Sequence, residues 1–435
     1  MSKLLRYKKF IFAAITILVV VVAVNLHSSN RGKKEVESHQ TAPPTPLNHL
    51  MSNSMSDLES TRKFDNAILR FMRYWDIKGG SFALMRNDSL IYAKGYGYAN
   101  LADSTECEVK HIFRVASVSK LITAVAVMHL CERGHLSPQD FVFGEEGILN
   151  DPQFLSYRDK NIKKITVDHL MRHTSGFSNP HGDAAFNMEL VAAYLGKPLP
   201  LSMDDMVYYA TQNRLRAKPG GRYNYSNLGY IVLSKIIEKV SGMPYEQYVK
   251  DSVLAPIGCY DIHLANNYSD GFRENEVDYY EVKEAEPVPA FDGRDSLVMK
   301  SHGGNDVHGL YGAGGWVASP VELLKLVSAI NKCPVKENFL TSETVDFMTP
   351  YQKNTKPAGW ASSSAKFWLR SGSMSGTSAL IKAQKDGYTW VFLSNSSSWN
   401  GPGLTRQMNR DITKAILRVK EWPEVDWFSL SEQTI

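Results

Sequence analysis

Ser117 and Lys120 stand three residues apart, just before an almost unbroken apolar run, Leu121–Met128. Residues three apart share one face of a helix, so the lysine amine can reach the serine hydroxyl. Burial disfavours a charged amine and lowers its pKa, which suits a base that accepts a proton from a hydroxyl. The pattern therefore predicts a serine nucleophile at the start of a buried helix, with Lys120 as its base.

The same Ser-x-x-Lys spacing occurs at Ser60 and at Ser363. The first lies on a polar helix face and the second in a serine-rich loop, where an exposed lysine keeps its proton. Taken alone, Ser117 also fits a helix-capping serine beside a lysine whose stem is buried. Only further motifs in the sequence can distinguish a nucleophile from a capping serine.

A second motif, Tyr225-Ser226-Asn227, follows a turn at Pro219-Gly-Gly221 and precedes an apolar helical run. In an extended segment Tyr225 and Asn227 point to the same side. A phenol beside a lysine cation loses its proton more readily, and an asparagine offers both a donor and an acceptor to a substrate amide. Each residue alone also fits ordinary packing or helix capping.

The third motif is Arg370-Ser371-Gly372, which we expect at the end of a strand and which Ser373 follows. A cation, a small hydroxyl residue and a glycine on a strand edge allow a substrate backbone to approach and pair with the sheet. An arginine that merely solvates the end of an edge strand is the alternative interpretation.

In this order, the three motifs resemble those of the serine beta-lactamase and DD-peptidase superfamily. The likeness is greatest to the class C-like branch, with its esterases, D-aminopeptidases and acyltransferases, where tyrosine-x-asparagine is the middle motif. It covers about residues 64–420, including blocks at 95–100, 165–177 and 312–319. We interpret these blocks as scaffold, and His173 within them as a structural residue rather than a triad base.

The resemblance implies that Ser117 is acylated, that Lys120 is its partner base and that Tyr225 relays protons. It implies further that Asn227 binds the acyl side chain or amide. The backbone N–H groups of Ser117 and Ser373 would form the oxyanion hole.

Arg370 departs from this resemblance, because such enzymes usually carry lysine or histidine there. Arginine stays protonated and grips a carboxylate through a fork of donors. We therefore hypothesise a substrate with a free carboxylate that Arg370 binds, while Ser371 and Gly372 bind the substrate backbone beside it.

The fate of the acyl group is left open by the sequence. Attack by water would make the protein an esterase, an amidase or a D-Ala-D-Ala carboxypeptidase-like enzyme, and attack by a bound alcohol or amine would make it an acyltransferase. The alternative is a catalytically inactive relative that binds peptidoglycan or peptides. The chain shows no cluster of metal-ligand residues and no phosphate-binding glycine loop, so we predict neither a metal nor a cofactor.

Strand patterns at both ends of the chain indicate the elements that must position these residues. Strands are predicted at 81–85 and 90–98, and again at 367–370, 378–384 and 388–394, with helices at 57–74 and 405–420. A helical subdomain is expected between them, at about 117–300. We predict an α+β fold in which both chain ends build one antiparallel sheet, with the substrate pocket in the cleft beside the helical part.

The charge and the N-terminus bear on location and partners. The formal net charge is +4, but the first 34 residues hold seven cations and no acid, which leaves −3 for residues 35–435. Such a body lacks the basic footprint of a nucleic-acid-binding protein. An apolar run at 10–24 behind four cations predicts an export signal or membrane anchor at 1–26. A polar linker at 27–56 and a periplasmic hydrolase domain at 57–425 are expected to follow.

Overall fold

Both ends of the chain contribute strands to one seven-stranded antiparallel sheet, as predicted. The computed structural model describes residues 44–178, 182–332, 337–352 and 354–431. The order of strands in the sheet is β3-β2-β1-β12-β11-β10-β9. Their bounds are Gly79–Arg86 (β1), Ser89–Asn100 (β2), Thr105–Glu106 (β3), Ser362–Ser363 (β9), Phe367–Met374 (β10), Thr377–Gln384 (β11) and Tyr388–Ser394 (β12). The N-terminal and C-terminal strands meet where β1 pairs with β12, with Phe82 opposite Phe392.

Tight turns set the register of the two terminal hairpins. Asn87 and Asp88 connect β1 to β2 with φ values of 49° and 63°, the left-handed conformations that a two-residue hairpin turn needs. Gly387, at φ 92°, lies in the turn between β11 and β12. Both turns lie between strands that the sequence predicts.

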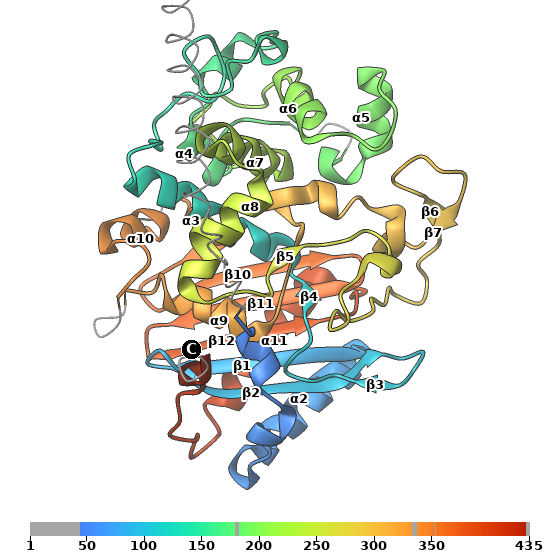
Figure 1. Ribbon diagram of the computed structural model, residues 1–435, viewed down its shortest axis with the longest axis vertical. Coiled ribbons are helices and arrows are strands. Elements are labelled where there is room, and N and C mark those ends of the chain that lie inside the picture. The colour runs from blue at the N-terminus through green and yellow to red at the C-terminus, as the bar shows by residue number, and fades with distance from the viewer. Residues whose placement is uncertain (1–43, 179–181, 333–336, 353, 432–435) are drawn as a thin grey trace, which may run out of the picture. The chain divides into compact units, whose positions relative to one another are not determined.

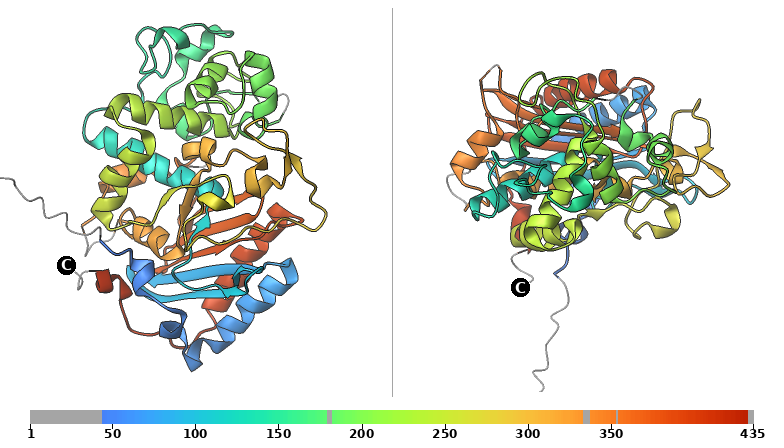
Figure 2. Two further views of the ribbon diagram at one scale, coloured as in Figure 1. Left: turned by 45° about the vertical axis from the view of Figure 1, so that its right-hand side comes forward. Right: turned by 90° about the horizontal axis from the view of Figure 1, so that it is seen from above.

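One face of the sheet is covered by two helices, α2 (Arg62–Trp75) and α11 (Gly401–Ile416), which lie side by side (Figure 2, left). Apolar side chains of both, such as Phe64, Ile68 and Met408, form a core with the sheet residues beneath them. Helix α2 begins five residues later than predicted, because 3₁₀ turns at Asn53–Ser56 and Glu59–Thr61 precede it. Helix α11 begins four residues earlier, capped by the Asn400 side chain.

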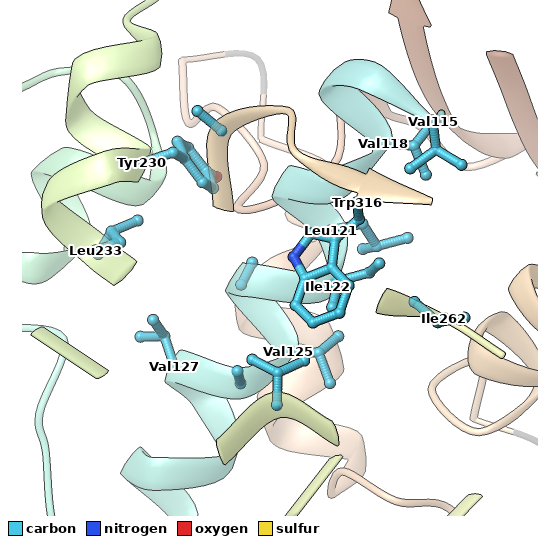
Figure 3. Close-up of a cluster of buried hydrophobic side chains, with 14 of the residues drawn as sticks. Val115, Val118, Leu121, Ile122, Val125, Val127, Tyr230, Leu233, Ile262 and Trp316 are labelled. Carbon is cyan, nitrogen blue, oxygen red and sulfur yellow. The ribbon is translucent and has the colours of Figure 1, made fainter. Parts of the chain in front are cut away.

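The helical part of the chain lies on the other side of the sheet (Figure 1). Its helices are α3 (Ser119–Glu132), α4 (Val167–Met171), α5 (Met188–Leu195), α6 (Met203–Thr211), α7 (Asn227–Ser241) and α8 (Tyr245–Val249), and α9 (Pro320–Ser328) and α10 (Ser342–Met348) follow later in the chain. Helix α3 is buried from Ser119 to Leu130. Figure 3 shows its apolar residues between Tyr230 and Leu233 of α7 and Trp316.

The central region is less helical than predicted beyond residue 254. Two small sheets are formed there instead, one by β4 (Phe113–Arg114), β8 (Trp316–Ala318) and β5 (His263–Leu264), the other by β6 (Val288–Pro289) and β7 (Leu297–Val298). Strand β4 leads directly into the turn that carries Ser117. The small sheet therefore fixes where α3 begins.

The compact body begins at Thr45, twelve residues before the predicted boundary. Leu47 and Met51 are buried in the core, and the Asn48 side chain donates to Asp261, 2.8 Å away. These residues are part of the domain and not of a linker. The predicted export segment at 1–26 and the linker up to residue 43 lie outside the described residues. Among the described residues, no helix is long and apolar enough to cross a bilayer.

Candidate active site

Ser117 lies in a single 3₁₀ turn, Ala116–Val118, between β4 and α3. The sequence places it in the first turn of the helix itself, whereas α3 begins two residues later. Ala116 has φ 48°, a left-handed conformation that is costly for a residue with a side chain. Such strain persists only where the surroundings enforce it, and here Gly372 of β10 packs against this turn.

Lys120 is fully buried at the start of α3, and its amine has three acceptors. Nζ donates to Asn227 Oδ1 at 2.6 Å and to Ser117 Oγ at 3.2 Å, and also to the carbonyl oxygen of Ala313. Three acceptors match the three hydrogens of an ammonium group. Asn227 Oδ1 and the Ala313 carbonyl oxygen can only accept, so these contacts stabilise the charged form of Lys120, whereas burial opposes that charge.

The carbonyl oxygen of Ala313 reaches Lys120 because the preceding glycine allows the close approach. A side chain at Gly312 would begin 2.4 Å from Thr123 Oγ1 and 2.7 Å from Ser234 Oγ. Those two hydroxyls bond the Gly312 backbone instead, Thr123 by donating to its carbonyl oxygen and Ser234 by accepting from its N–H. From the sequence, we interpret the block at 312–319 only as scaffold. In the structure it also supplies the Ala313 carbonyl oxygen as an acceptor for Lys120.

Tyr225 brings its phenol to the nucleophile from the loop before α7. Its hydroxyl lies 2.7 Å from Ser117 Oγ and accepts a hydrogen bond from Arg370 Nη2 at 3.2 Å. Burial alone would raise the pKa of Tyr225, but the charges of Lys120 and Arg370 and the bonds to its oxygen lower it to about 7. Burial lowers the pKa of Lys120 to about 8, against the opposing effect of Tyr225.

His173 lies behind Tyr225, with ring centroids 4.4 Å apart. Its Nδ1 accepts from the backbone N–H of Ser226, 3.2 Å away. Burial, reinforced by the charges of Lys120 and Arg370, holds the pKa of His173 well below its usual range. The neutral ring of His173 packs behind the Tyr225 phenol and supports it directly. This fits the structural role that we expect for His173.

Arg370 lies in the middle of β10, because the strand continues to Met374 rather than ending at Arg370 as predicted. Its side chain is 2% exposed, and Nε donates to the carbonyl oxygen of Ser117 at 2.7 Å. With Nη2 committed to Tyr225, the guanidinium holds the nucleophile turn and the phenol together. Only Nη1 has no hydrogen bond to another described residue.

The rest of the third motif borders the same turn. A side chain at Gly372 would begin 2.9 Å from the backbone nitrogen of Ser117, so the strand passes directly beside that N–H group. Ser371 is half-buried and Ser373 exposed. Strand β9 pairs only with Trp368 and Leu369, which leaves this edge of β10 without a partner strand from Arg370 onward.

Asn227, the first residue of α7, has both ends of its amide engaged. Its Oδ1 accepts from Lys120, and its Nδ2 donates to Asp183 Oδ2 at 2.7 Å. Asp183 is half-buried and was not singled out in the sequence, where a lone acid in a loop carries no pattern. Its negative charge raises the pKa of Lys120 against the larger effect of burial.

The structure thus gathers Ser117, Lys120, Tyr225, Asn227 and Arg370 around one hydroxyl, at the junction of the sheet and the helical part. A hydroxyl bonded to a phenol of lowered pKa, beside a buried cation and next to free strand backbone, is suited to nucleophilic attack on a carbonyl. The described residues contain no group of histidine, cysteine, aspartate or glutamate able to hold a metal ion.

Known proteins share this fold and sequence pattern. The family model "Beta-lactamase" matches residues 64–414. "Putative penicillin-binding protein PbpX" of Bacillus subtilis (strain 168) is 26% identical over 324 residues, 72% of this chain and 69% of that protein. The chain spans less than half the length of several other curated relatives that it matches.

Two solved structures extend the comparison of the fold. D-amino acid amidase from Ochrobactrum anthropi SV3 gives a TM-score of 0.63 at 18% identity, over 83% of this chain and 98% of that one. EstCE1, described as a hydrolase with promiscuous acyltransferase activity, gives 0.60 at 19% identity, over 82% and 98%. At such identities the likeness establishes a common α+β architecture.

Proposed function

Because this chain belongs to the beta-lactamase family, we propose that it is a serine acyl-enzyme hydrolase or acyltransferase acting on ester or amide substrates. The observation that carries the proposal is the pair of contacts at Ser117 Oγ, with Tyr225 at 2.7 Å and Lys120 at 3.2 Å. Their donors and acceptors form one connected network around the nucleophile. An isolated capping serine has no such network.

Acylation begins when the Tyr225 phenolate accepts the proton of Ser117 and Oγ attacks the carbonyl carbon of the substrate. The oxygen that becomes negative is stabilised by the N–H groups of Ser117 and Ser373. When the bond to the leaving group breaks, Tyr225 returns its proton to the departing oxygen or nitrogen. Ser117 is then esterified, and Tyr225 is again a phenolate.

We assign the base to Tyr225 and not to Lys120 because the Tyr225 hydroxyl is the group nearer to Ser117 Oγ, at 2.7 Å against 3.2 Å. Burial raises the pKa of Tyr225, but the charges of Lys120 and Arg370 lower it overall, which favours a phenolate beside the serine. Lys120 Nζ also has acceptors in Asn227 and Ala313 that stabilise its ammonium form. Lys120 then acts as the charge that keeps the phenolate stable.

Release of the acyl group repeats the chemistry with a second nucleophile. Tyr225 accepts a proton from water, or from a bound alcohol or amine, which attacks the acyl carbon, and it then returns the proton to Ser117. The names of D-amino acid amidase and EstCE1 support hydrolysis of amides and transfer to an acceptor, respectively. Intact mass of the acyl-enzyme, with and without an added alcohol, separates the two outcomes.

The hypothesis of a substrate carboxylate rests on Arg370 alone. To bind that carboxylate through two hydrogen bonds, Arg370 would have to give up its bonds from Nε to Ser117 and from Nη2 to Tyr225. We therefore propose that Arg370 first positions the nucleophile turn and lowers the pKa of Tyr225. A free carboxylate on the substrate stays a prediction that the Arg370 variant described below tests.

Labelling with a fluorophosphonate or a fluorescent penicillin tests the enzyme against an inactive binding protein. The intact protein should form one covalent adduct at Ser117, and Ser117→Ala should form none. Equal absence of label in both proteins, with binding of peptidoglycan fragments retained, would establish the binder instead. We also propose export of the protein on the basis of its N-terminal segment, which cell fractionation tests.

A further inference from the structure

The outer helix pair, α2 and α11, carries a strong positive charge on a body that is otherwise acidic. Residues 62–75 hold four cations and one acid, and residues 401–420 hold five cations and one acid. These two segments thus carry +7, whereas residues 35–435 as a whole carry −3. The rest of residues 35–435 therefore carries −10, and the helix pair is a region of net positive charge on one side of the sheet.

The cations form stripes that point away from the sheet. Arg406, Arg410 and Lys414 follow one another at four-residue spacing on α11, and Lys63 and Arg70 share a face of α2. All nine are exposed: Arg62, Lys63, Arg70, Arg73, Arg406, Arg410, Lys414, Arg418 and Lys420. Within the described part of the chain, only Arg62 and Arg410 of these nine form ion pairs, with Glu59 and Asp411.

The acid of α2 does not neutralise this surface, because it faces the sheet. Asp65 accepts hydrogen bonds from the hydroxyls of Tyr92 and Tyr96, and its second oxygen pairs with Lys94 at 3.2 Å. The outward stripe of α2 therefore consists of cations and neutral side chains.

A groove of about 520 Å³ runs between the two helices. Its apolar lining includes Phe64 and Phe71 of α2 and Ile412 of α11, and Lys63 and Arg418 are among the cations that border it. The acid in the lining, Asp411, is paired with Arg410 at 2.8 Å. An apolar floor between cations matches a molecule with a hydrocarbon part and a negative head group.

Large apolar side chains lie exposed at both ends of the pair. Tyr74, at the end of α2, is 62% exposed, and Trp399, which stacks on Trp75 at 4.9 Å, is 64% exposed. Leu417, just after α11, is 62% exposed. Aromatic residues beside cations are typical of surfaces at the level of lipid head groups, whereas a soluble polyanion needs only the charges.

We propose that the outer helix pair docks on the surface of a bilayer that contains anionic phospholipids. The cations bind the phosphate groups, and Tyr74, Trp399 and Leu417 enter the head-group region. Catalysis can proceed while the protein is docked, because the site lies on the other side of the sheet. Side chains alternate along β10: Leu369 packs against the helix pair, whereas Trp368 and Arg370 lie on the opposite face. Residues 27–44, which can span at most ~65 Å, separate the predicted anchor from the body.

Lysine labelling of the full chain on vesicles tests this orientation even where the N-terminal segment already holds the protein to the lipid. The vesicles contain phosphatidylcholine alone or mixed with phosphatidylglycerol. On the mixed vesicles, acylation of Lys63 and Lys414 by an amine-reactive reagent should slow several-fold. Lys110, Lys160 and Lys164, which are exposed elsewhere, should react at unchanged rates. Added salt should restore the labelling, since it screens exposed charges.

A triple variant, Arg70→Gln with Arg406→Gln and Arg418→Gln, keeps both reporter lysines and removes three stripe charges. Its affinity for the anionic surface should fall by on the order of 100-fold, at roughly five-fold per cation. The matched control, Arg214→Gln with Arg216→Gln and Arg222→Gln, removes three exposed charges elsewhere and should keep the protection. Unchanged melting temperatures show that both variants fold.

The proposal is overturned if Lys63 and Lys414 react equally on both kinds of vesicle, or if the control variant loses protection as the stripe variant does. Protection by soluble inorganic polyphosphate without protection by the anionic vesicles would identify a soluble polyanion as the partner, and would also overturn it.

Discussion

The Tyr225 hydroxyl is closer to the Ser117 hydroxyl than the Lys120 amine is, at 2.7 Å against 3.2 Å. The charges of Lys120 and Arg370 also lower the pKa of Tyr225 overall, against the effect of burial. Distance and electrostatics therefore both favour the phenol as the group that accepts the serine proton.

Acylation should depend on pH as a narrow bell. The rate should rise as Tyr225 loses its proton near pH 7 and fall as Lys120 loses its charge near pH 8. Tyr225→Phe should lower the acylation rate by roughly 10²–10⁴-fold and remove the acidic limb. Single-turnover acylation across this pH range measures both effects. An acidic limb that survives in Tyr225→Phe would assign the base elsewhere.

Arg370→Gln should lower acylation of neutral and anionic esters by the same factor, roughly 10- to 100-fold, the value of a hydrogen bond to a charged group. Burial raises the pKa of Tyr225, and loss of the Arg370 charge removes one of the effects that lower it. The acidic limb should therefore move to higher pH. A loss confined to anionic esters would instead support the substrate carboxylate inferred from sequence.

Asp183→Asn should move the alkaline limb to lower pH. Burial lowers the pKa of Lys120 and the Asp183 carboxylate opposes it, so removing that charge lets the pKa fall further. The amide keeps an oxygen that accepts from Asn227 Nδ2, which preserves the shape of the site. The pH profile of acylation measures the shift, and an unmoved alkaline limb would show that Asp183 does not act on Lys120.

Gly372→Ala should disable the site by displacing the nucleophile turn. The new methyl group would begin 2.3 Å from the carbonyl oxygen of Val115, a contact with backbone that cannot move aside cheaply. We expect a loss of about 1–3 kcal/mol in unfolding free energy together with loss of acylation. Gly401→Ala is the matched control, because its methyl group would meet only Ser373 Oγ, at 3.8 Å. Thermal unfolding and adduct formation compare the two.

Patterns within single elements were enough to predict the architecture. The alternation of apolar and polar residues predicts the strands of the two terminal hairpins. Because these strands lie near both ends of the chain, we predict that they form one sheet, as they do. Ser117 and Lys120 meet as their three-residue spacing predicts, and Tyr225 joins them as the family resemblance implies. These features depend on local periodicity or on short motifs, which a sequence displays directly.

The features that could not be predicted depend on contacts between distant segments. Strand β10 runs through Arg370 to Met374 because β11 pairs with it along that whole length, although the serines and glycines there are typical of a loop. The Ala313 carbonyl lies 193 residues from Lys120, and a backbone group has no signature of its own. Asp183 likewise gains meaning only when the fold brings it to Asn227.

The strand order also has a consequence for how the protein is made. Ser117 precedes Arg370 by 253 residues, and β12, which joins the two halves of the sheet, is the last strand of the chain. A chain emerging from the ribosome exposes its serine and lysine long before β10 exists to hold them. Until the C-terminal strands take their places beside β1, the nascent polypeptide has an unpaired strand edge and lacks the Arg370 contacts that hold the Ser117 turn, so the candidate site is assembled only after β10, β11 and β12 have been made.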